Sequence, residues 1–381
     1  MNLLDRYIFR SVLLTCAGAV GLFAFVLTAG NVVRDLLPYV LAGQLSAGLS
    51  AVLVVDTIVA VTTYALPMGI LTGVLLTLGR LSADSEITAM RAGGLSLPRI
   101  ARPVVLLALL GMALGLYINF ESMPRSKISY ERQLTEAVSA NPLRLITPKT
   151  FIRNFRNLVL YVDEKDGPLL RDVWIWQLDD AGRAVQLLHA AEARVSYLSD
   201  TNELVVTFNR ALLEMRDKEN PEDFSNPPMI GSSEALEPVH LPLGDVLGRK
   251  IVHQKPQWMT YAELRAEQRR RAAEPVPPAG SRQHASDVMQ IALVIQDKFN
   301  LAVAIFSFGL LGVPLGIKVS RRETSANLGV AVLLALGYYF LSRAASWLSP
   351  HPEYRPDLLL WVPNLIFIGL SVWLFRRIDR R

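Results

Sequence analysis

TIVAVTTYALPMGILTGVLLTLG, residues 57–79, runs for 23 residues without a charged side chain. At 1.5 Å per residue, a helix of this length crosses a hydrocarbon core of about 30 Å. Five further uncharged windows share this pattern, at residues 11–33, 103–120, 299–317, 324–342 and 358–375. A charge at the centre of such a helix costs about 2.5–3.5 kcal/mol on insertion scales, so six clean windows indicate six transmembrane helices.

The six windows fall into two groups of three, separated by a long polar segment. This arrangement predicts a first transmembrane half over residues 1–120, an inserted domain over 121–297 and a second transmembrane half over 298–381. We therefore expect an α-helical polytopic membrane protein with a 3+3 topology.

Basic residues outside the windows are concentrated on one side of the predicted membrane. The segments 1–10, 80–102, 318–323 and 376–381 hold 13 Lys or Arg residues against 5 acidic ones, a net charge of +8. Cytoplasmic loops are the ones enriched in Lys and Arg, so both termini are expected in the cytoplasm and the inserted domain outside it. These flanks account for the overall charge of +5, so we expect no nucleic-acid partner.

The inserted domain is predicted to be all-β. Residues rich in β-branched and aromatic side chains recur about every ten positions between turn signals. The expected strands are residues 158–162, 173–176, 194–197 and 204–208. This spacing, without an intervening helical pattern, is typical of an antiparallel sandwich or jelly roll.

The end of the inserted domain carries different signals. Residues 216–234 are polar and contain Pro and Gly, which predicts a long loop. Thr260 and Glu263 have the spacing of a capping box, so a helix is expected to begin there and to end near Ala273. Residues 274–281 then predict a flexible linker.

No catalytic, cofactor-binding or metal-binding motif is present. The five histidines lack metal-ligand spacing, and no glycine-rich loop ends in Gly-Lys-Ser/Thr. His189 and Glu192 are expected on opposite faces of a strand, as ordinary sheet residues. No ionisable residue lies inside a window, which disfavours ion-coupled transport. The Gly-x-x-x-Gly patterns at Gly69, Gly111 and Gly312 are interpreted as sites of close helix packing.

The loop between the second and third windows predicts a short helix at about residues 82–94. Ser82 can cap its start, and the acidic Asp84 and Glu86 favour its positive end. Arg91 lies near its negative end, and the glycine pair that follows stops it.

Ala83, Ile87 and Met90 fall on one face of this predicted helix and form a small apolar stripe. Such a stripe needs something to pack against. An interfacial helix lying on the lipid surface and a lever that inserts into a soluble ATPase are both compatible with the pattern.

Several of these segments resemble one family, the LptF/LptG permeases of the lipopolysaccharide export ABC transporter. The matching segments are SEITAMRAGGLS at 85–96, LDRY at 4–7, ALPMG at 65–69, LGVPLG at 311–316 and the Arg pair at 321–322. The resemblance covers the whole chain, although the inserted domain matches only in kind.

The resemblance implies a permease subunit of the bacterial inner membrane with a jelly-roll-like periplasmic domain. Its implied partners are a cytoplasmic ABC ATPase dimer that binds the ATP, a paralogous permease, a periplasmic bridge protein of the LptC/LptA type, and lipopolysaccharide. This chain would therefore be a transport subunit without enzymatic activity or cofactors of its own. Asp84, Glu86 and Arg91 would then couple to the ATPase, with Ile87 and Met90 as the packing face.

The resemblance also implies contacts with lipopolysaccharide phosphates. Arg34 follows the first window and Arg343 follows the fifth, and the corresponding family helices line a lateral gate for the lipid. Arg34 matches a basic position of the family, but Asn31 stands where a second basic residue is usual. From its location alone, Arg34 is compatible with an ordinary snorkelling flank.

Two other functions remain open at this stage. A membrane-anchored periplasmic scaffold would be indifferent to a change at Glu86, whereas an ABC permease would lose its ATPase. The other alternative is a permease of another lipid or lipoprotein exporter. One of the lipoprotein-release or MacB type would have four spans, which topology reporters after Ser342 and Arg376 would reveal.

Overall fold

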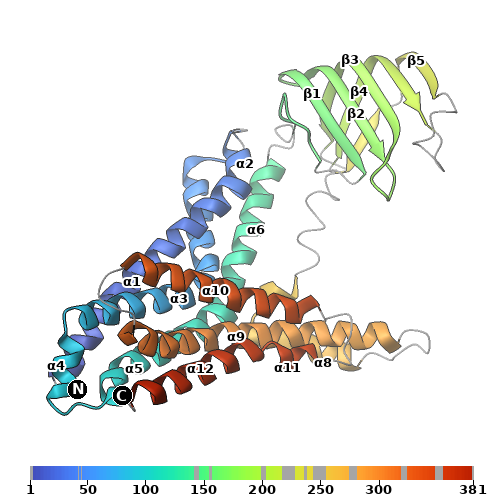
Figure 1. Ribbon diagram of the computed structural model, residues 1–381. Coiled ribbons are helices and arrows are strands. Elements are labelled where there is room, and N and C mark those ends of the chain that lie inside the picture. The colour runs from blue at the N-terminus through green and yellow to red at the C-terminus, as the bar shows by residue number, and fades with distance from the viewer. Residues whose placement is uncertain are drawn as a thin grey trace. The chain divides into compact units, whose positions relative to one another are not determined.

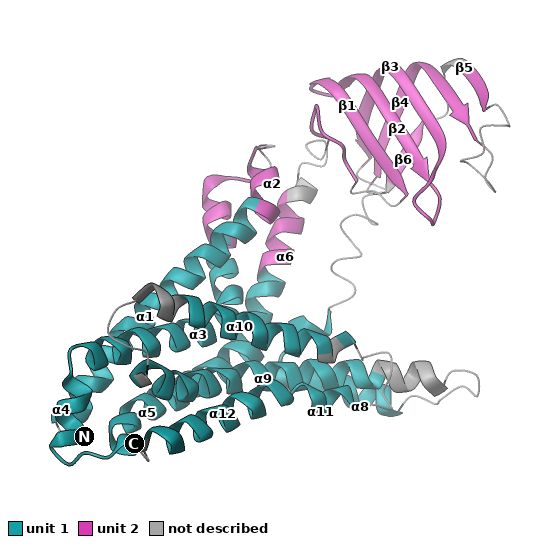
Figure 2. Ribbon diagram, in the orientation of Figure 1, with its two compact units in different colours: residues 1–33, 54–129, 255–381 teal, residues 34–53, 130–254 magenta. Residues whose placement is uncertain are grey.

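The computed structural model describes residues 3–41, 43, 45–140, 146–153, 157–198, 203–216, 228–235, 238–242, 255–273, 281–318, 324–347 and 355–379. The chain divides into two compact units (Figure 2). The first unit contains Met1–Val33, Val54–Ser129 and Lys255–Arg381, and the second contains Arg34–Leu53 and Tyr130–Gln254. The predicted domain limit at residue 121 falls inside a continuous helical run, and the unit boundary lies between Ser129 and Tyr130.

Most of the long helices form where apolar stretches leave the backbone no partner except itself. The longer ones are α1 (Leu3–Asn31), α3 (Ala47–Ala83), α5 (Leu97–Tyr117), α6 (Met123–Ala140), α9 (Ser281–Lys318), α10 (Thr324–Trp347) and α12 (Val362–Asp379). The shorter ones are α2 (Leu37–Leu41), α4 (Glu86–Ala92), α8 (Tyr261–Ala273) and α11 (Pro356–Leu359). Single π-turns, η1 (Val32–Leu36) and η2 (Ile118–Ser122), continue α1 and α5, and the 3₁₀ turn η5 (Pro256–Trp258) precedes α8.

Five helical stretches among the described residues are long and apolar enough to cross a membrane. They are Leu3–Leu41, Ala47–Ala83, Leu97–Ala137, Val288–Ile317 and Pro356–Ile378. These stretches contain five of the six predicted windows. The sixth window lies in α10, whose apolar part, Gly329–Ala344, is shorter. The protein is therefore a multi-pass membrane protein, and the count of six spans stays a prediction.

The first unit is a helical bundle in which α9 packs against both α5 and α12 (Figure 1). Small residues hold its helices close together, as the Gly-x-x-x-Gly patterns predicted. A Cβ atom added to Gly73 of α3 would lie 2.5 Å from the Cα atom of Cys16 in α1. A Cβ atom added to Gly69 would lie 2.6 Å from the Cα atom of Val20. Because these neighbours are backbone atoms, α1 and α3 touch along their main chains.

The second unit contains an antiparallel sheet. Its strands are β1 (Leu158–Asp166), β2 (Leu169–Leu178), β3 (Ala184–Leu198), β4 (Glu203–Met215), β5 (Met229–Ala235) and β6 (Val239–Pro242). The order is β1-β2-β3-β4-β5, with β6 also paired to β4 (Figure 1). Alternate residues such as Val173 and Ile175 of β2 are buried, so one face of the sheet forms a core.

The four predicted strands are confirmed, and each is longer than the sequence indicated. The loop predicted over residues 216–234 is wrong at its end, because residues 229–234 belong to β5. Backbone pairing with β4 outweighs the poor strand propensity of this polar segment. The described strands form a single sheet, so the jelly roll stays a prediction. Residues 199–202 and 217–227 lie outside the described residues.

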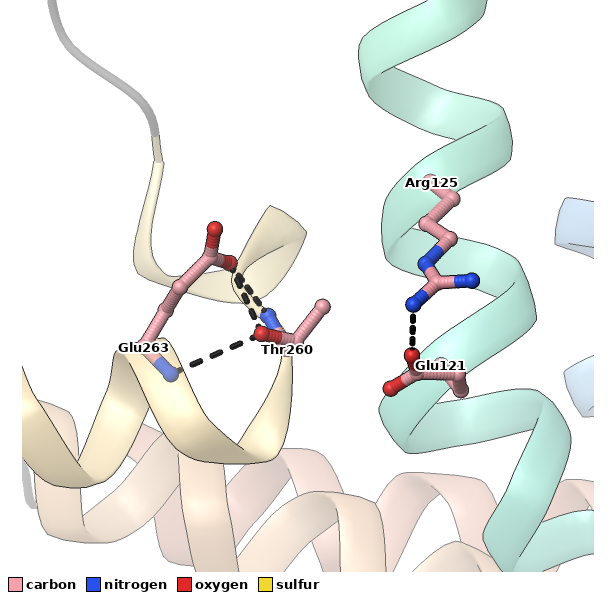
Figure 3. A network of polar contacts seen from close by, with 4 residues as sticks. All are labelled: Glu121, Arg125, Thr260 and Glu263. Carbon is pink, nitrogen blue, oxygen red and sulfur yellow. Dashed lines mark hydrogen bonds and ion pairs between the residues drawn. The ribbon is translucent and has the colours of Figure 1, made fainter.

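The predicted capping box is confirmed at the start of α8 (Figure 3). The Thr260 backbone N–H donates to Glu263 Oε2 at 2.8 Å, and the Glu263 N–H donates to Thr260 Oγ1 at 3.5 Å. The helix ends at Ala273, as expected. Figure 3 also shows the ion pair between Glu121 and Arg125, one helical turn apart. Residues 274–280 of the predicted linker lie outside the described residues, and its last residue, Ser281, begins α9.

The main-chain contact of α1 with α3 leads to a first prediction. Gly73→Ala forces these two backbones apart, and overpacking of this kind costs about 1–3 kcal/mol. The matched control is Gly21→Ala, because a Cβ atom there meets nothing within 4 Å. Thermal unfolding of the detergent-solubilised variants should show a lower midpoint for Gly73→Ala alone. Equal midpoints would contradict the close packing.

Candidate functional site

The cytoplasmic loop that the sequence singled out contains α4, but its limits differ from the prediction. The helix begins at Glu86, because α3 continues through Ala83 and a turn at residues 84–85 separates the two helices. The prediction that Ser82 caps the helix is wrong. Its hydroxyl instead donates to the Ile317 carbonyl oxygen at 3.0 Å and ties the end of α3 to the end of α9.

Local backbone geometry determines both ends of α4. Ser85 precedes the helix in the left-handed region, with φ of 63°, and its carbonyl accepts the Ala89 N–H at 2.9 Å. Gly93 and Gly94 end the helix as predicted, since their N–H groups donate to the carbonyls of Ala89 and Arg91. Gly94 has φ of 88°, a conformation that favours glycine.

The apolar stripe of α4 packs inward. Ile87 is only 3% exposed and lies in a cluster of buried residues from α1, α3, α5 and α9, and Met90 packs against the same cluster. The stripe is therefore covered by this chain itself, a partner that the sequence pattern did not name. Its packing fixes α4 to the ends of the spans.

The polar residues around α4 connect it to the start of α1. The Tyr7 hydroxyl donates to Glu86 Oε2 at 3.1 Å, and Arg80 Nη2 donates to the Ser11 hydroxyl at 2.8 Å. Asp5 and Arg99, which flank these contacts, form an ion pair of 3.7 Å. The LDRY segment and the loop signature, 79 residues apart at Tyr7 and Glu86, therefore meet in one place.

The outward side of this segment carries the charges. Asp84 and Arg91 are exposed and Glu86 is half-buried, so all three are open to solvent at least in part. A carboxylate in the first turn of a helix is electrostatically favourable, and one that also accepts a hydrogen bond from Tyr7 has a fixed direction. We define the α4 knob as residues 84–94, held by Ile87 and presenting Glu86.

This anchoring leads to a second prediction. Ile87→Ala removes a fully packed side chain and is expected to lower the free energy of unfolding by about 2–5 kcal/mol. Thr88→Ala is the matched control, because Thr88 is exposed on the same helix. Chemical unfolding in detergent measures both variants. If Ile87→Ala unfolds like the control, α4 is not anchored by this residue.

Arg34 lies in η1 and has an acidic partner that the sequence analysis overlooked. Its Nε and Nη2 atoms donate to the two carboxylate oxygens of Asp35 at 2.8 and 3.0 Å, a bidentate pair. The Arg34 side chain remains 74% exposed. Asn31, at the position where the family usually has a basic residue, donates to the Leu27 carbonyl. The adjacent carboxylate in the sequence was the signal for this pair.

Arg343 lies on α10 and also has partners. It hydrogen-bonds to Tyr64 of α3 and interacts with the Asp297 carboxylate of α9. Arg34 and Arg343 belong to different units of the chain. Arg34 therefore forms an ion pair with Asp35, whereas Arg343 interacts electrostatically with Asp297.

Two ionisable residues lie next to the fourth window, and the prediction that none lies deep within a span stays a prediction. The fourth window begins at residue 299, but the apolar stretch of α9 begins at Val288 and includes Asp297 and Lys298. The Lys298 ammonium, 5% exposed, donates to the carbonyl oxygens of Asn119 and Met259, both at 2.9 Å. Asn119 Nδ2 in turn donates a hydrogen bond to the Lys298 carbonyl oxygen at 3.0 Å.

This arrangement explains why Lys298 is tolerated in an apolar environment. Asn119 lies in η2, where the π-turn disrupts the regular helical ladder and leaves carbonyls for other donors. The buried ammonium supplies such a donor, and both groups are satisfied. Lys298 therefore joins the end of α5 to α9, a link that a search for uncharged windows could not reveal.

Among the described residues, no group of three or more His, Cys, Asp or Glu side chains could hold a metal ion. The geometry is that of a mechanical element: long apolar helices in close contact, with a short polar knob braced at one end. Such an arrangement is that of a polytopic membrane protein.

Sequence comparison identifies the family. The chain belongs to the family described as lipopolysaccharide export system permease LptF/LptG, whose pattern matches residues 6–377. The lipopolysaccharide export system permease protein LptF of Escherichia coli (strain K12) is 24% identical over 317 residues, which cover 81% of this chain and 76% of the relative. The LptF protein of Shigella flexneri matches with the same values. The protein is thus a lipopolysaccharide export permease subunit of the inner membrane.

Proposed function

We propose that this chain is the LptF-type half of an ABC transporter that extracts lipopolysaccharide from the inner membrane. Membership of the family supports this, and so do the curated relatives, which carry the LptF name. ATP would be bound and hydrolysed by a separate cytoplasmic ATPase dimer, and this chain would need no cofactor.

The α4 knob is the proposed contact with that ATPase. Glu86, Asp84 and Arg91 are its polar residues and would meet complementary charges on the ATPase. Ile87 and Met90 would act from the inner side of α4. Because they pack into the bundle, they would transmit movement of the knob to α1, α3 and α5. Rigid packing transmits such displacements because close-packed cores compress little.

The proposed topology has six spans and places both termini in the cytoplasm and the sheet in the periplasm. The basic flanks support this orientation, since α12 ends with Arg376 and Arg377 and the α4 segment carries Arg80 and Arg91. The sixth span would be α10, of which 24 residues are helical. A helix of that length, about 36 Å, can cross a bilayer.

Two assemblies complete the proposal. A paralogous permease would pair with this chain's spans, supported by the large apolar side chains exposed on α1 and α10, such as Phe25 and Phe340. A periplasmic bridge protein of the LptC/LptA type would continue the sheet at an edge strand, where unpaired backbone groups accept a further strand. Lipopolysaccharide would then pass from the spans to the bridge.

Arg34 and Arg343 are the proposed contacts for lipopolysaccharide phosphates. Arg34 would exchange the Asp35 carboxylate for a phosphate, so Asp35 acts as a competitor of the lipid. A guanidinium binds a phosphate with the same bidentate geometry that Arg34 uses with Asp35.

Competition between Asp35 and the lipid can be measured. Arg34→Ala should lower the amount of lipopolysaccharide that copurifies with the complex, and Asp35→Ala should raise it. We expect each change to stay within about fivefold, because exposed ion pairs are weak. Quantitative mass spectrometry measures the amount of lipopolysaccharide bound to each variant. A fall in both would mean that the pair acts as a structural unit and not as a phosphate site.

The coupling role of α4 has a direct test. Glu86→Lys reverses the charge at the start of the helix and should abolish copurification of the ATPase with the detergent-solubilised permease. Because Glu86 is half-buried at the surface, the fold should survive, and an unchanged unfolding midpoint would verify this.

Tyr7→Phe is the matched control for this experiment. It removes the hydrogen bond to Glu86 but keeps the carboxylate, so the ATPase should still copurify, with lower ATP turnover. Full ATPase recovery with Glu86→Lys would favour the membrane-anchored scaffold and would rule out the proposed coupling.

A further inference from the structure

A cleft of about 550 Å³ opens at one end of the sheet, within the second unit. The residues that line it are Phe151, Arg153, Asn157, Leu158, Val159, Trp176, Leu178, Asp179, Asp180 and Gly182. Its volume lies within the range of small-molecule sites, about 300–1,000 Å³. Neither the coupling site nor the phosphate contacts described above involve these residues.

The aromatic wall of the cleft is formed by Trp176 and Phe151. Their ring centroids lie 5.8 Å apart at an interplanar angle of 48°. Behind Trp176, the indole of Trp174 stacks at 6.0 Å and 16°, and the His189 ring stacks on Trp174 at 4.0 Å and 24°. The stack fixes the Trp176 indole in one orientation, and this order is what a flat binding platform requires.

The strand pattern explains why these rings are outside the core. Val173 and Ile175 of β2 are buried, so Trp174 and Trp176 project from the opposite face. Cross-strand pairing places His189 beside Trp174, and the bridge of Ile152 with Leu160 brings Phe151 to the same place. Phe151 is 57% exposed, so the core of the sheet does not require an aromatic residue at this position.

Polar groups surround this wall. Asn157 adopts φ of 56°, its carbonyl accepts the Leu178 N–H at 2.7 Å, and its Nδ2 donates to Asp180 Oδ1 at 3.3 Å. The Asp179 carboxylate accepts the Arg183 N–H at 2.7 Å, Arg183 Nε at 2.8 Å and the Ala181 N–H at 3.0 Å. These bonds, above all the one from the Arg183 backbone, keep the pKa of Asp179 below its usual value.

The chemistry of the cleft indicates its ligand. The two faces of a sugar ring carry C–H groups that stack on an indole, whereas its hydroxyls both donate and accept hydrogen bonds. The Asn157 amide, the Asp180 carboxylate and the Arg153 guanidinium supply the complementary donors and acceptors. Two carboxylates against one guanidinium among the lining residues disfavour a phosphate.

We propose that this cleft is a saccharide-binding subsite for neutral sugars of the lipopolysaccharide core. The proposal rests on the proposed function, because it names the part of the substrate that the second unit contacts. Trp176 and Phe151 stack on the sugar, and Asn157 and Asp180 bond to its hydroxyls. The sheet thus recognises the carbohydrate independently of the acyl chains and phosphates.

The test uses the full-length protein in detergent and a lipid-free, dephosphorylated core oligosaccharide as the probe. Isothermal titration calorimetry and saturation-transfer NMR should detect binding by the wild-type protein. Trp176→Ala should weaken that binding by about tenfold or more, and Trp176→Phe should restore most of it, because both rings offer a stacking face. Trp258→Ala, in the first unit, is the matched control and should bind like the wild type.

Folding is separated from binding by a second variant. Phe151 lies on the segment beside β1 and is exposed, so Phe151→Ala should leave the unfolding midpoint unchanged and still weaken the oligosaccharide. Equal affinity of Phe151→Ala and the wild type would overturn the proposal. Displacement of the probe by inorganic phosphate would also overturn it, because the site would then be an anion site.

The subsite and the proposed function fail in different ways. If intact lipopolysaccharide and the ATPase copurify with the protein but the free oligosaccharide does not bind, the subsite is refuted and the transport function stands. If the oligosaccharide binds through Trp176 but Glu86→Lys leaves the ATPase attached, the subsite is supported and the coupling proposal is refuted.

Discussion

The contact between the backbones of α1 and α3 is the constraint on which the helical unit depends. Gly73 lies against Cys16, and the two helices run in opposite directions from that crossing. Nine residues separate Gly73 from Ser82 at the end of α3, and nine separate Cys16 from Tyr7 near the start of α1. At 1.5 Å per residue, both segments rise by about 13.5 Å and end at the same level. Tyr7 therefore lies level with the end of α3, and the turn at residues 84–85 brings Glu86 to its hydroxyl.

Two buried polar residues, Lys298 and Asn364, also link helices of the bundle. The ammonium of Lys298 lies among carbonyl oxygens, and the amide of Asn364 donates to Asn300 Oδ1 and to the Asn300 carbonyl oxygen at 3.0 Å. Both residues connect α9 to a neighbouring helix. In apolar surroundings a donor without a hydrogen-bond partner costs several kcal/mol. These bonds therefore determine which helices lie next to each other, and they add less to the free energy of unfolding. Close packing at glycines and these polar links together hold the helices of the bundle beside one another.

Much of the architecture could be predicted from residue patterns. Uncharged windows located the helices of the bundle, the Thr260 capping box located the start of α8, and alternating residues located four strands. Errors arose where a partner from elsewhere in the chain decided the outcome. Ser82 was assigned as a cap, but the end of α9 binds its hydroxyl. Residues 229–234 were assigned to a loop, but β4 supplies their hydrogen bonds. The bonds of Lys298 could not be predicted, because its carbonyl partners lie 179 and 39 residues away.

The sequence alone determined the class of protein. Hydropathy, charge asymmetry and short capping signals act over neighbouring residues and do not depend on tertiary contacts. The loop signature around Glu86 likewise predicts the position of the proposed coupling segment. Only the tertiary structure decided the direction in which the side chains of that segment face. It buried Ile87 in this chain's own core, brought Tyr7 to Glu86, and placed Phe151 beside Trp176. Each of these outcomes depends on distances between distant residues, and such distances are set by packing and not by local pattern.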